Sequence, residues 1–208
     1  MTALAAHTIT DLPSLEALFG APGEASLRKE APFLHPVYRQ WIEASPSAVL
    51  ATVGPDGLDA SPRGDPAGLV TVQDAQTILL PERRGNNRID SLRNIVRDPR
   101  VALLFLIPGV GETLRVNGRA RICVAPELLQ QMAMGDTPPK CVIEVTVDTV
   151  FFQCARAMQR SKLWSAPNAE ALRSVPTAGA MLAALTDSAI DGAAYDSDLP
   201  ARQSATLY

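Results

Sequence analysis

The amino-acid sequence predicts a mainly β protein, organised as a small barrel with helices at its periphery. Short apolar runs that are typical of strands follow one another at close spacing and are separated by turn signals. Residues 113–123 alternate apolar and polar side chains, which is the period-two pattern of a strand. A single helical segment interrupts these strands, whereas a parallel α/β sheet needs helical crossovers between successive strands. The pattern therefore favours a barrel.

The first 45 residues are expected to form a helical extension that packs on the core. Asp11 is placed to cap a first helix that ends at Gly20. A second helix is expected to begin at Pro36, with apolar side chains along one face. We therefore treat residues 1–45 as an N-terminal extension of a single domain that spans residues 1–208.

The strands of the predicted barrel follow this extension. Pro55-Asp56-Gly57 is a tight turn signal that would join the first two strands. The segment 101–107 is nearly all apolar, so we expect it to be a central strand. Strands are expected at residues 47–53, 58–61, 68–72, 77–80, 101–107, 113–123 and 141–147.

One helix is expected inside the run of strands, over residues 88–96. Its spacing would turn Ile89, Leu92 and Val96 inward, and an Asp-Pro pair would end it.

Further helices are expected late in the chain. A short one is predicted at residues 126–134 and another at residues 177–185, whereas residues 151–164 combine strand and helix features. We treat residues 165–208 as a C-terminal helix and tail.

Composition and charge exclude several classes of protein. The formal net charge of −3 argues against a nucleic-acid-binding protein that relies on overall positive charge. No apolar run is long enough to span a bilayer, and the N-terminus lacks the basic and apolar regions of a signal peptide. The three cysteines form no CxxC pair, so free thiols in a reducing cytoplasm are expected.

The sequence holds only two histidines, His7 and His35. A histidine-rich metal site is therefore not expected, and neither histidine lies near a nucleophile motif such as GxSxG. No other side chain is a convincing acid or base, so we nominate no catalytic residue. These features favour a reaction whose chemistry is carried by a bound cofactor.

Two cationic segments, both rich in hydrogen-bond donors, suit a phosphate-bearing ligand. In the first, Arg63 directly follows a predicted strand, and Gly64 would let a ligand approach the backbone closely. Taken alone, Arg63 is equally well explained as a surface arginine in a loop.

The second cationic segment, residues 83–88, reads RRGNNR and precedes the predicted central helix. Helix N-termini present free N–H groups and a positive dipole end, and arginine adds a charged fork that matches phosphate oxygens. Helical spacing would place Ser91 on the same side as Asn87 and Arg88. Together with Asn86, these residues are candidates for binding a phosphate. The alternative is that Asn87 only caps the helix and that the arginines are solvated.

A third segment, residues 151–164, combines aromatic rings, three cations and a glutamine. Phe152 and Trp164 are able to stack on a planar ring, and core packing is the alternative for each. Arg160 and Trp164 are i,i+4 neighbours if the segment is helical, so they would act at one site or stack on each other.

Three runs of the sequence carry a resemblance to a known family: ATVGPDGLDASPRGDPAG, LLPERRGNNRIDSLRNIVRDPRVALLFLIPGVGETLRVNGRARI and FFQCARAMQRSKLW. They resemble the pyridoxamine 5'-phosphate oxidase-like superfamily of FMN-binding split β-barrels, most of all its bacterial branch of FMN-dependent enzymes. The middle run is the most specific, and the resemblance extends roughly from the second helix to the tail. It implies a six-stranded antiparallel split barrel and a homodimer, with one FMN per subunit bound where the two subunits meet.

The resemblance also implies which residues contact the cofactor. The FMN phosphate and ribityl chain would be held by Arg63 together with the group Asn87, Arg88 and Ser91. The isoalloxazine ring would be approached from the partner subunit by Gln153, Arg160 and Trp164.

The sequence departs from pyridoxamine phosphate oxidases proper in two places. It ends SATLY where those enzymes carry a tryptophan and an Arg-Leu-x-Pro ending, and the run SPRGDPAGLV lacks the lysine that many members use near the phosphate. The resemblance therefore does not extend to pyridoxal-phosphate synthesis.

The function expected from the sequence is that of an FMN-dependent oxidoreductase acting on a small molecule. The alternative is a non-catalytic protein that binds or carries a flavin, haem or deazaflavin on the same barrel. A third interpretation is a structural dimerisation domain whose arginines merely lie on the surface.

Overall fold

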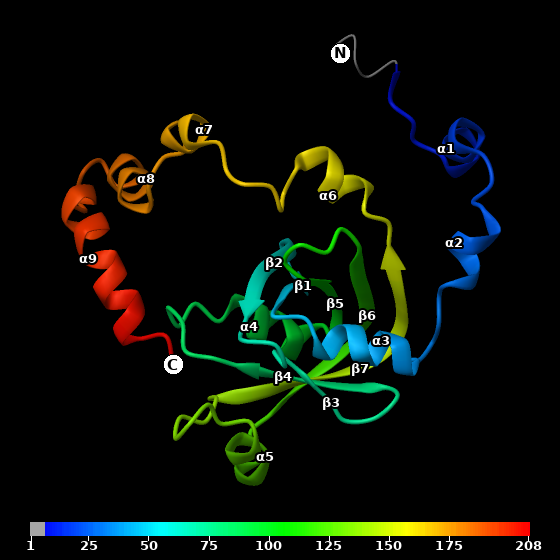
Figure 1. Cartoon of the computed structure of the whole chain (residues 1–208), viewed down its shortest axis with the longest axis horizontal. Helices are drawn as coiled ribbons and strands as arrows, with labels where there is room; N and C mark the ends of the chain where they lie inside the picture. The colour runs from blue at the N-terminus through cyan, green and yellow to red at the C-terminus, as the bar shows by residue number, and fades with distance from the viewer. Residues whose placement is uncertain (1–6) are drawn as a thin grey trace.

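The computed structural model describes residues 7–208 and builds them around one sheet (Figure 1). Within these residues seven strands pair in the order β2-β1-β5-β6-β7-β4-β3, and every pairing is antiparallel. The strands are β1 (Ser47–Gly54), β2 (Gly57–Gly64), β3 (Thr71–Val72), β4 (Thr77–Glu82), β5 (Arg100–Leu106), β6 (Thr113–Cys123) and β7 (Cys141–Gln153).

The expected mainly β class with peripheral helices is confirmed, but the sheet has seven strands rather than the six that the resemblance implies. The two-residue strand β3 accounts for the difference. The sequence pattern indicates a strand at residues 68–72, of which only Thr71–Val72 pairs with β4. Within the described residues no backbone pairing joins the edge strands β2 and β3, so the sheet is open between them.

Alternate residues of the central strands supply the core. In β5, the side chains of Val101, Leu103 and Phe105 are buried and their neighbours are half-buried. In β6, the predicted period of two is confirmed, with Leu114 and Val116 buried. Burying each large side chain of this kind stabilises the fold by about 1.5–3 kcal/mol. These strands therefore form a firm scaffold on which β2 and β4 present polar residues.

The helices differ in how much of their surface they bury. In α3, Ile42 is fully buried, and the half-buried Tyr38 and Trp41 pack against the same core. In contrast, α1 and α2 bury no residue. The N-terminal extension was expected to pack on the core, and this part of it does not. The helices of residues 7–208 are α1 (Leu12–Phe19), α2 (Glu24–Arg28), α3 (Pro36–Glu43), α4 (Asp90–Arg97), α5 (Pro126–Gln131), α6 (Arg156–Ser161), α7 (Ala169–Arg173), α8 (Ala178–Leu185) and α9 (Gly192–Ala205).

The helix α4 buries a different face from the one that its apolar residues indicate. Ile89 precedes the helix and Val96 is 77% exposed, so the prediction that both point inward was wrong. The buried residues are instead Ser91, Asn94 and Ile95. Asn94 faces inward because its Nδ2 donates a hydrogen bond of 3.0 Å to Oγ1 of the buried Thr52 in β1.

The C-terminal helices α8 and α9 pack on each other and arc away from the sheet before the chain returns towards it (Figure 1). The helix expected at residues 177–185 is confirmed as α8. A Cβ atom on Gly179 would lie 2.0 Å from the carbonyl oxygen of Gly192, so the two helices approach this closely only because glycine occupies that position. No helix among residues 7–208 is long and apolar enough to cross a membrane.

We predict that Gly118→Ala destabilises the sheet. A Cβ atom at this position would lie 2.2 Å from the backbone carbonyl oxygen of Thr146, where the pairing of β6 and β7 shifts register. Overpacking against backbone should lower the free energy of unfolding by about 2 kcal/mol, as measured by urea denaturation. Gly23→Ala is the matched control, because a Cβ there meets nothing within 4 Å. A wild-type urea midpoint for Gly118→Ala would contradict this close approach.

We predict that Asp98→Asn removes an acid-sensitive component of stability. Hydrogen bonds from Arg100 lower the pKa of Asp98 from 3.8 to about 2. A lowered carboxyl pKa contributes stability above the unfolded-state value, and that contribution is lost as the pH falls from about 4 to about 2. The variant should therefore have a lower Tm than the wild type at pH 6, and the difference should shrink towards pH 2. A Tm difference that is constant with pH would contradict this assignment.

Candidate functional site

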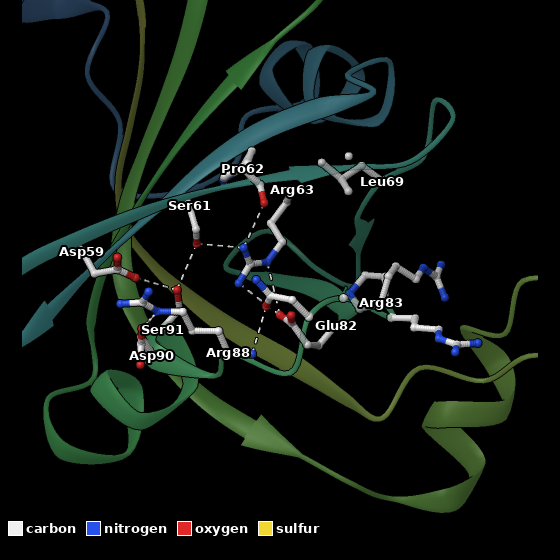
Figure 2. A pocket seen from close by; sticks show the side chains of 15 residues that line it. Asp59, Ser61, Pro62, Arg63, Leu69, Glu82, Arg83, Arg88, Asp90 and Ser91 are labelled. Carbon is white, nitrogen blue, oxygen red and sulfur yellow. Dashed lines mark hydrogen bonds and ion pairs between the residues drawn. The ribbon is translucent and has the colours of Figure 1, made fainter. Parts of the chain in front are cut away.

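A cavity of about 510 Å³ opens between β2, β4 and the first turn of α4 (Figure 2). We call it the β2–β4 cavity. Alternate residues of β2 point to one face of the sheet, which brings Asp59, Ser61 and Arg63 to the same wall. The complete lining consists of residues 59, 61–64, 69, 81–86, 88, 90 and 91.

The guanidinium of Arg63 is held on several sides. Its Nη1 donates to Ser61 Oγ at 2.8 Å and to the Pro62 carbonyl oxygen at 2.9 Å. Its Nε and Nη2 each lie 3.2 Å from Glu82 Oε2, at the end of β4. Figure 2 shows Arg63 between these groups, and its side chain is only 15% exposed. The arginine is therefore fixed in place, and Glu82 neutralises part of its charge.

A chain of hydroxyl hydrogen bonds joins β2 to the beginning of α4. Ser91 Oγ donates to Asp59 Oδ2 at 2.9 Å, and the hydroxyls of Ser61 and Ser91 lie 3.0 Å apart. Each serine hydroxyl has one hydrogen, so Ser61 must be the donor to Ser91. The bonds thus run in one direction, from Arg63 through the two serines to Asp59.

The segment that connects β4 to α4 does not present all of its polar residues to the cavity. Arg83 lines the cavity, but its guanidinium is held by groups outside the lining: Nε donates to Asp65 Oδ2 and Nη1 donates to the Met132 carbonyl oxygen, both at 2.7 Å. Asn87 has a left-handed backbone with φ of 59°, and its Oδ1 accepts a hydrogen bond from Lys140. Asn87 therefore does not line the β2–β4 cavity.

The start of α4 also differs from the predicted one. The helix begins at Asp90, with Ile89 at the N-cap position and no side-chain cap, so the interpretation of Asn87 as an N-cap was wrong. Asn86 Oδ1 accepts a hydrogen bond of 2.9 Å from the Arg88 backbone N–H. The Arg88 side chain is 79% exposed and pairs with Asp90, which lowers the pKa of that carboxyl.

Arg84 is the cation that the cavity leaves uncompensated. The lining contains four arginines and three carboxylates. Three of the arginines form ion pairs: Arg63 with Glu82, Arg88 with Asp90, and Arg83 with Asp65, which lies outside the lining. The remaining carboxylate of the lining, Asp59, accepts a hydrogen bond from Ser91. Among residues 7–208 no hydrogen-bond or ion-pair partner is seen for Arg84. An anion that enters the cavity therefore meets one free positive charge in addition to the fixed donors.

Five of the nine predicted site residues line the β2–β4 cavity, whereas Asn87 and the three predicted ring contacts do not. Arg63, Gly64, Asn86, Arg88 and Ser91 come together at the β2–β4 cavity. The predicted ring contacts lie outside its lining: Gln153, Arg160 and Trp164.

The predicted ring contacts belong to β7, α6 and the segment after it. Gln153 ends β7, and Arg160 lies in α6 with its side chain exposed. Trp164 donates from Nε1 to the Val110 carbonyl oxygen at 2.8 Å. Their role as contacts from a partner subunit stays a prediction.

Sequence reasoning missed several polar residues of the lining, among them Asp59, Ser61 and Glu82. Asp59 and Ser61 precede Arg63 by four and two positions, so the strand period alone places them on its face. Glu82 directly precedes the predicted cationic segment and Arg84 lies within it, but no local pattern reports that Glu82 is paired and that Arg84 is not.

Several solved structures are similar to this chain. HupZ from Group A Streptococcus is 23% identical, with a TM-score of 0.46 over 56% of this chain and 90% of that chain. General Stress Protein 26 from Bacillus anthracis is 19% identical, with a TM-score of 0.41 over 53% and 86% of the two chains. An FMN-binding protein from Syntrophomonas wolfei is 13% identical, with a TM-score of 0.43 over 55% and 82%. All three TM-scores are below 0.5.

A protein-family model matches more than half of this chain. No curated protein sequence matches the chain. The family model described as pyridoxamine 5'-phosphate oxidase matches residues 34–154, which is more than half of the 208 residues. The matched span runs from the residue pair before α3 to the residue after β7, and it contains the whole β2–β4 cavity. The chain belongs to the pyridoxamine 5'-phosphate oxidase family.

Proposed function

We propose that the protein is a cytoplasmic, homodimeric, FMN-dependent oxidoreductase that holds the FMN phosphate and ribityl chain in the β2–β4 cavity. The observation that carries this proposal is the convergence of Arg63, Ser61 and Ser91 on one cavity at the start of α4. The volume of about 510 Å³ lies within the range of about 300–1,000 Å³ that is usual for small-molecule sites.

The residues of the cavity fit a phosphate. Arg63 presents a guanidinium that needs little reorganisation, and Arg84 adds the free positive charge. The first turn of α4 adds unpaired N–H groups and the positive end of the helix dipole. A Cβ at Gly85 would meet nothing within 4 Å, so the backbone there is open to a ligand.

When bound, FMN would supply electron or hydride transfer. The chain's own residues would bind and orient it. Arg63 would bind the phosphate, and Arg84 would balance its charge. The hydroxyls of Ser61 and Ser91 would give up their present hydrogen bonds and donate to the phosphate oxygens instead. Arg88 and Asn86, at the mouth of the same cavity, are placed to contact the ribityl chain.

The proposed homodimer rests on two features of the single chain. The predicted ring contacts Gln153, Arg160 and Trp164 do not line the cavity, so a second subunit would have to bring them to the flavin. The extensions also expose large apolar side chains, including Phe19 and Leu185. A symmetric partner would cover such surfaces, and the six longer strands would then form the split barrel of each subunit.

The cytoplasmic location in this proposal is supported by the cysteines. Cys123, Cys141 and Cys154 are all free, and burial raises the pKa of the Cys141 thiol. Unpaired thiols suit a reducing compartment.

One observation favours a second candidate function, a non-catalytic flavin, haem or deazaflavin carrier. Every carboxylate of the β2–β4 cavity is engaged by an arginine or a serine, so none is free to act as an acid or base. Turnover that depends on NAD(P)H or on a substrate separates the two: steady turnover supports the enzyme, and a flavin that is reduced only once supports the carrier.

We predict that Arg63→Met lowers the affinity for FMN by at least tenfold. Charged hydrogen bonds of this kind contribute about 1.5–3 kcal/mol, which corresponds to at least a tenfold change in Kd. The measurement is the Kd from quenching of FMN fluorescence, together with the flavin absorbance of the purified protein. Arg119→Met is the matched control, because that arginine is exposed and lies 3.8 Å from its nearest carboxylate.

A second variant keeps the FMN proposal testable if Arg63→Met disturbs the fold. Arg84→Met breaks no contact seen within residues 7–208, so it should fold normally and still bind FMN more weakly. A colourless wild-type protein that takes up no FMN, or wild-type affinity in both variants, would overturn the proposal.

We predict that Glu82→Gln strengthens FMN binding by about fivefold. The amide keeps an oxygen that accepts from Arg63, but it no longer neutralises the guanidinium or repels the phosphate. One unit charge at about 4 Å is worth about 1 kcal/mol in water, and salt screens it. The gain in Kd should therefore shrink as the ionic strength rises. Weaker FMN binding by Glu82→Gln would contradict the prediction. It would show that the main effect of the carboxylate is to position Arg63, and not to oppose the binding of phosphate.

A further inference from the structure

A second cavity, of about 420 Å³, shares the segment Arg83 to Gly85 with the β2–β4 cavity. The turn at residues 137–140 and Tyr208 complete its lining, and we call it the Lys140 cavity. Asn86 lines only the first of these two cavities and Asn87 only the second. The connecting segment from β4 to α4 is thus a wall between two separate spaces.

The charges of the Lys140 cavity are not balanced. Its lining contains Arg83, Arg84 and Lys140 but no acidic residue. Arg83 is neutralised from outside the lining by the buried carboxylate of Asp65. Lys140 Nζ donates to Asn87 Oδ1 at 2.9 Å, which is a neutral partner, and Arg84 has no partner within residues 7–208. Two positive charges therefore face this space with no carboxylate side chain in the lining to neutralise them, and the terminal carboxylate of Tyr208 forms an ion pair with neither.

Neutral hydrogen-bond donors accompany the two charges. A lysine ammonium only donates, so the bond from Lys140 fixes the Asn87 amide with its oxygen towards the lysine. The amide Nδ2 of Asn87 is left free to donate elsewhere. Asparagine adopts the left-handed backbone more readily than most residues, and this conformation (φ 59°) holds the side chain at the Lys140 cavity.

Tyr208 ties the C-terminal segment to this arrangement. Its phenol lies near the carboxylate of Asp65, and desolvation together with that carboxylate raises the pKa of the phenol. The phenol therefore stays protonated at neutral pH beside the same carboxylate that neutralises Arg83. Figure 1 shows the chain returning from α9 towards the sheet at this end.

We propose that the Lys140 cavity binds a second anionic group, the phosphate of a small molecule, separate from the phosphate that we assign to the β2–β4 cavity. Paired charges dominate the first cavity and unpaired cations dominate the second, so an anion gains more charge compensation in the second. Arg84 lines both cavities, whereas Lys140 and Asn87 line only the second, so with FMN bound next door the proposal rests on Lys140 and Asn87.

The test is calorimetric titration of the full chain with inorganic phosphate, in low-salt buffer and with FMN present at saturation. The wild-type protein should bind one phosphate under these conditions. Lys140→Met should weaken this binding by about tenfold or more, whereas Lys140→Arg should retain it. Lys162→Met is the matched control, because that exposed lysine lies outside the cavity. Equal phosphate affinity in the wild type and Lys140→Met would overturn the proposal.

The same variants separate this proposal from that of FMN binding. If the protein takes up no FMN, the proposed function fails, yet the phosphate titration still decides the second site. At least one phosphate should then bind and be weakened by Lys140→Met, and any second phosphate in the β2–β4 cavity should be weakened by Ser91→Ala instead. A single phosphate site that is insensitive to Lys140→Met would leave the Lys140 cavity without a ligand.

Competition by flavin nucleotides identifies the source of the anion. A flavin dinucleotide that displaces phosphate from the Lys140 cavity, where FMN does not, would show that the site takes the second phosphate of a cofactor. Phosphate binding that is unaffected by either nucleotide would assign the site to the phosphate of a separate small molecule.

Discussion

The contact between Arg63 and Glu82 is the interaction on which the shape of the site depends. Arg63 lies in the edge strand β2, and Glu82 ends β4, which four other strands separate from β2 in the sheet. A flat sheet would keep these side chains far apart, because neighbouring strands are about 4.8 Å apart. Their separation of 3.2 Å requires the sheet to curl until β2 approaches β4. The β2–β4 cavity is the space that this curl encloses.

The helix α4 is adapted to the same curl. It packs against β1, β2 and β6, and the residues that it buries are partly polar. Asn94 bonds to Thr52 in β1, and Ser91 bonds to Asp59 in β2. A helix with only an apolar stripe could pack at several rotations about its own axis. Hydrogen bonds are directional, so these two bonds can form at only one rotation of α4. Polar burial therefore fixes which residues of α4 reach the cavity, at the end of the helix where an anion is favoured.

The sequence predicted the features of the fold that local patterns determine. The apolar run of β5 and the period of two in β6 both appear in the structure, as does α8. Arg63 and Ser91, which the sequence singled out as candidates, both line the β2–β4 cavity, and their role in binding stays a prediction.

Contacts between distant residues explain the predictions that were wrong. The inward face of α4 is chosen by Thr52, which lies 42 residues before Asn94. Asn87 turns away from Ser91 because the helix begins only at Asp90 and because its amide bonds to Lys140, 53 residues later. Helical spacing and helix propensity contain no information about such partners, so a single sequence places these residues on the wrong side.

The segment between β4 and α4 determines how independent the two cavities are. Arg84 lines both cavities. It is the unpaired cation of the β2–β4 cavity, and together with Lys140 it provides the positive charge of the Lys140 cavity. An anion in either cavity therefore lowers the positive potential that the other offers. Ser91 and Lys140, by contrast, each line a single cavity. Occupancy of the two sites should thus be anticooperative, because the two anions repel each other and share Arg84, and replacing Arg84 by methionine should weaken anion binding in both cavities.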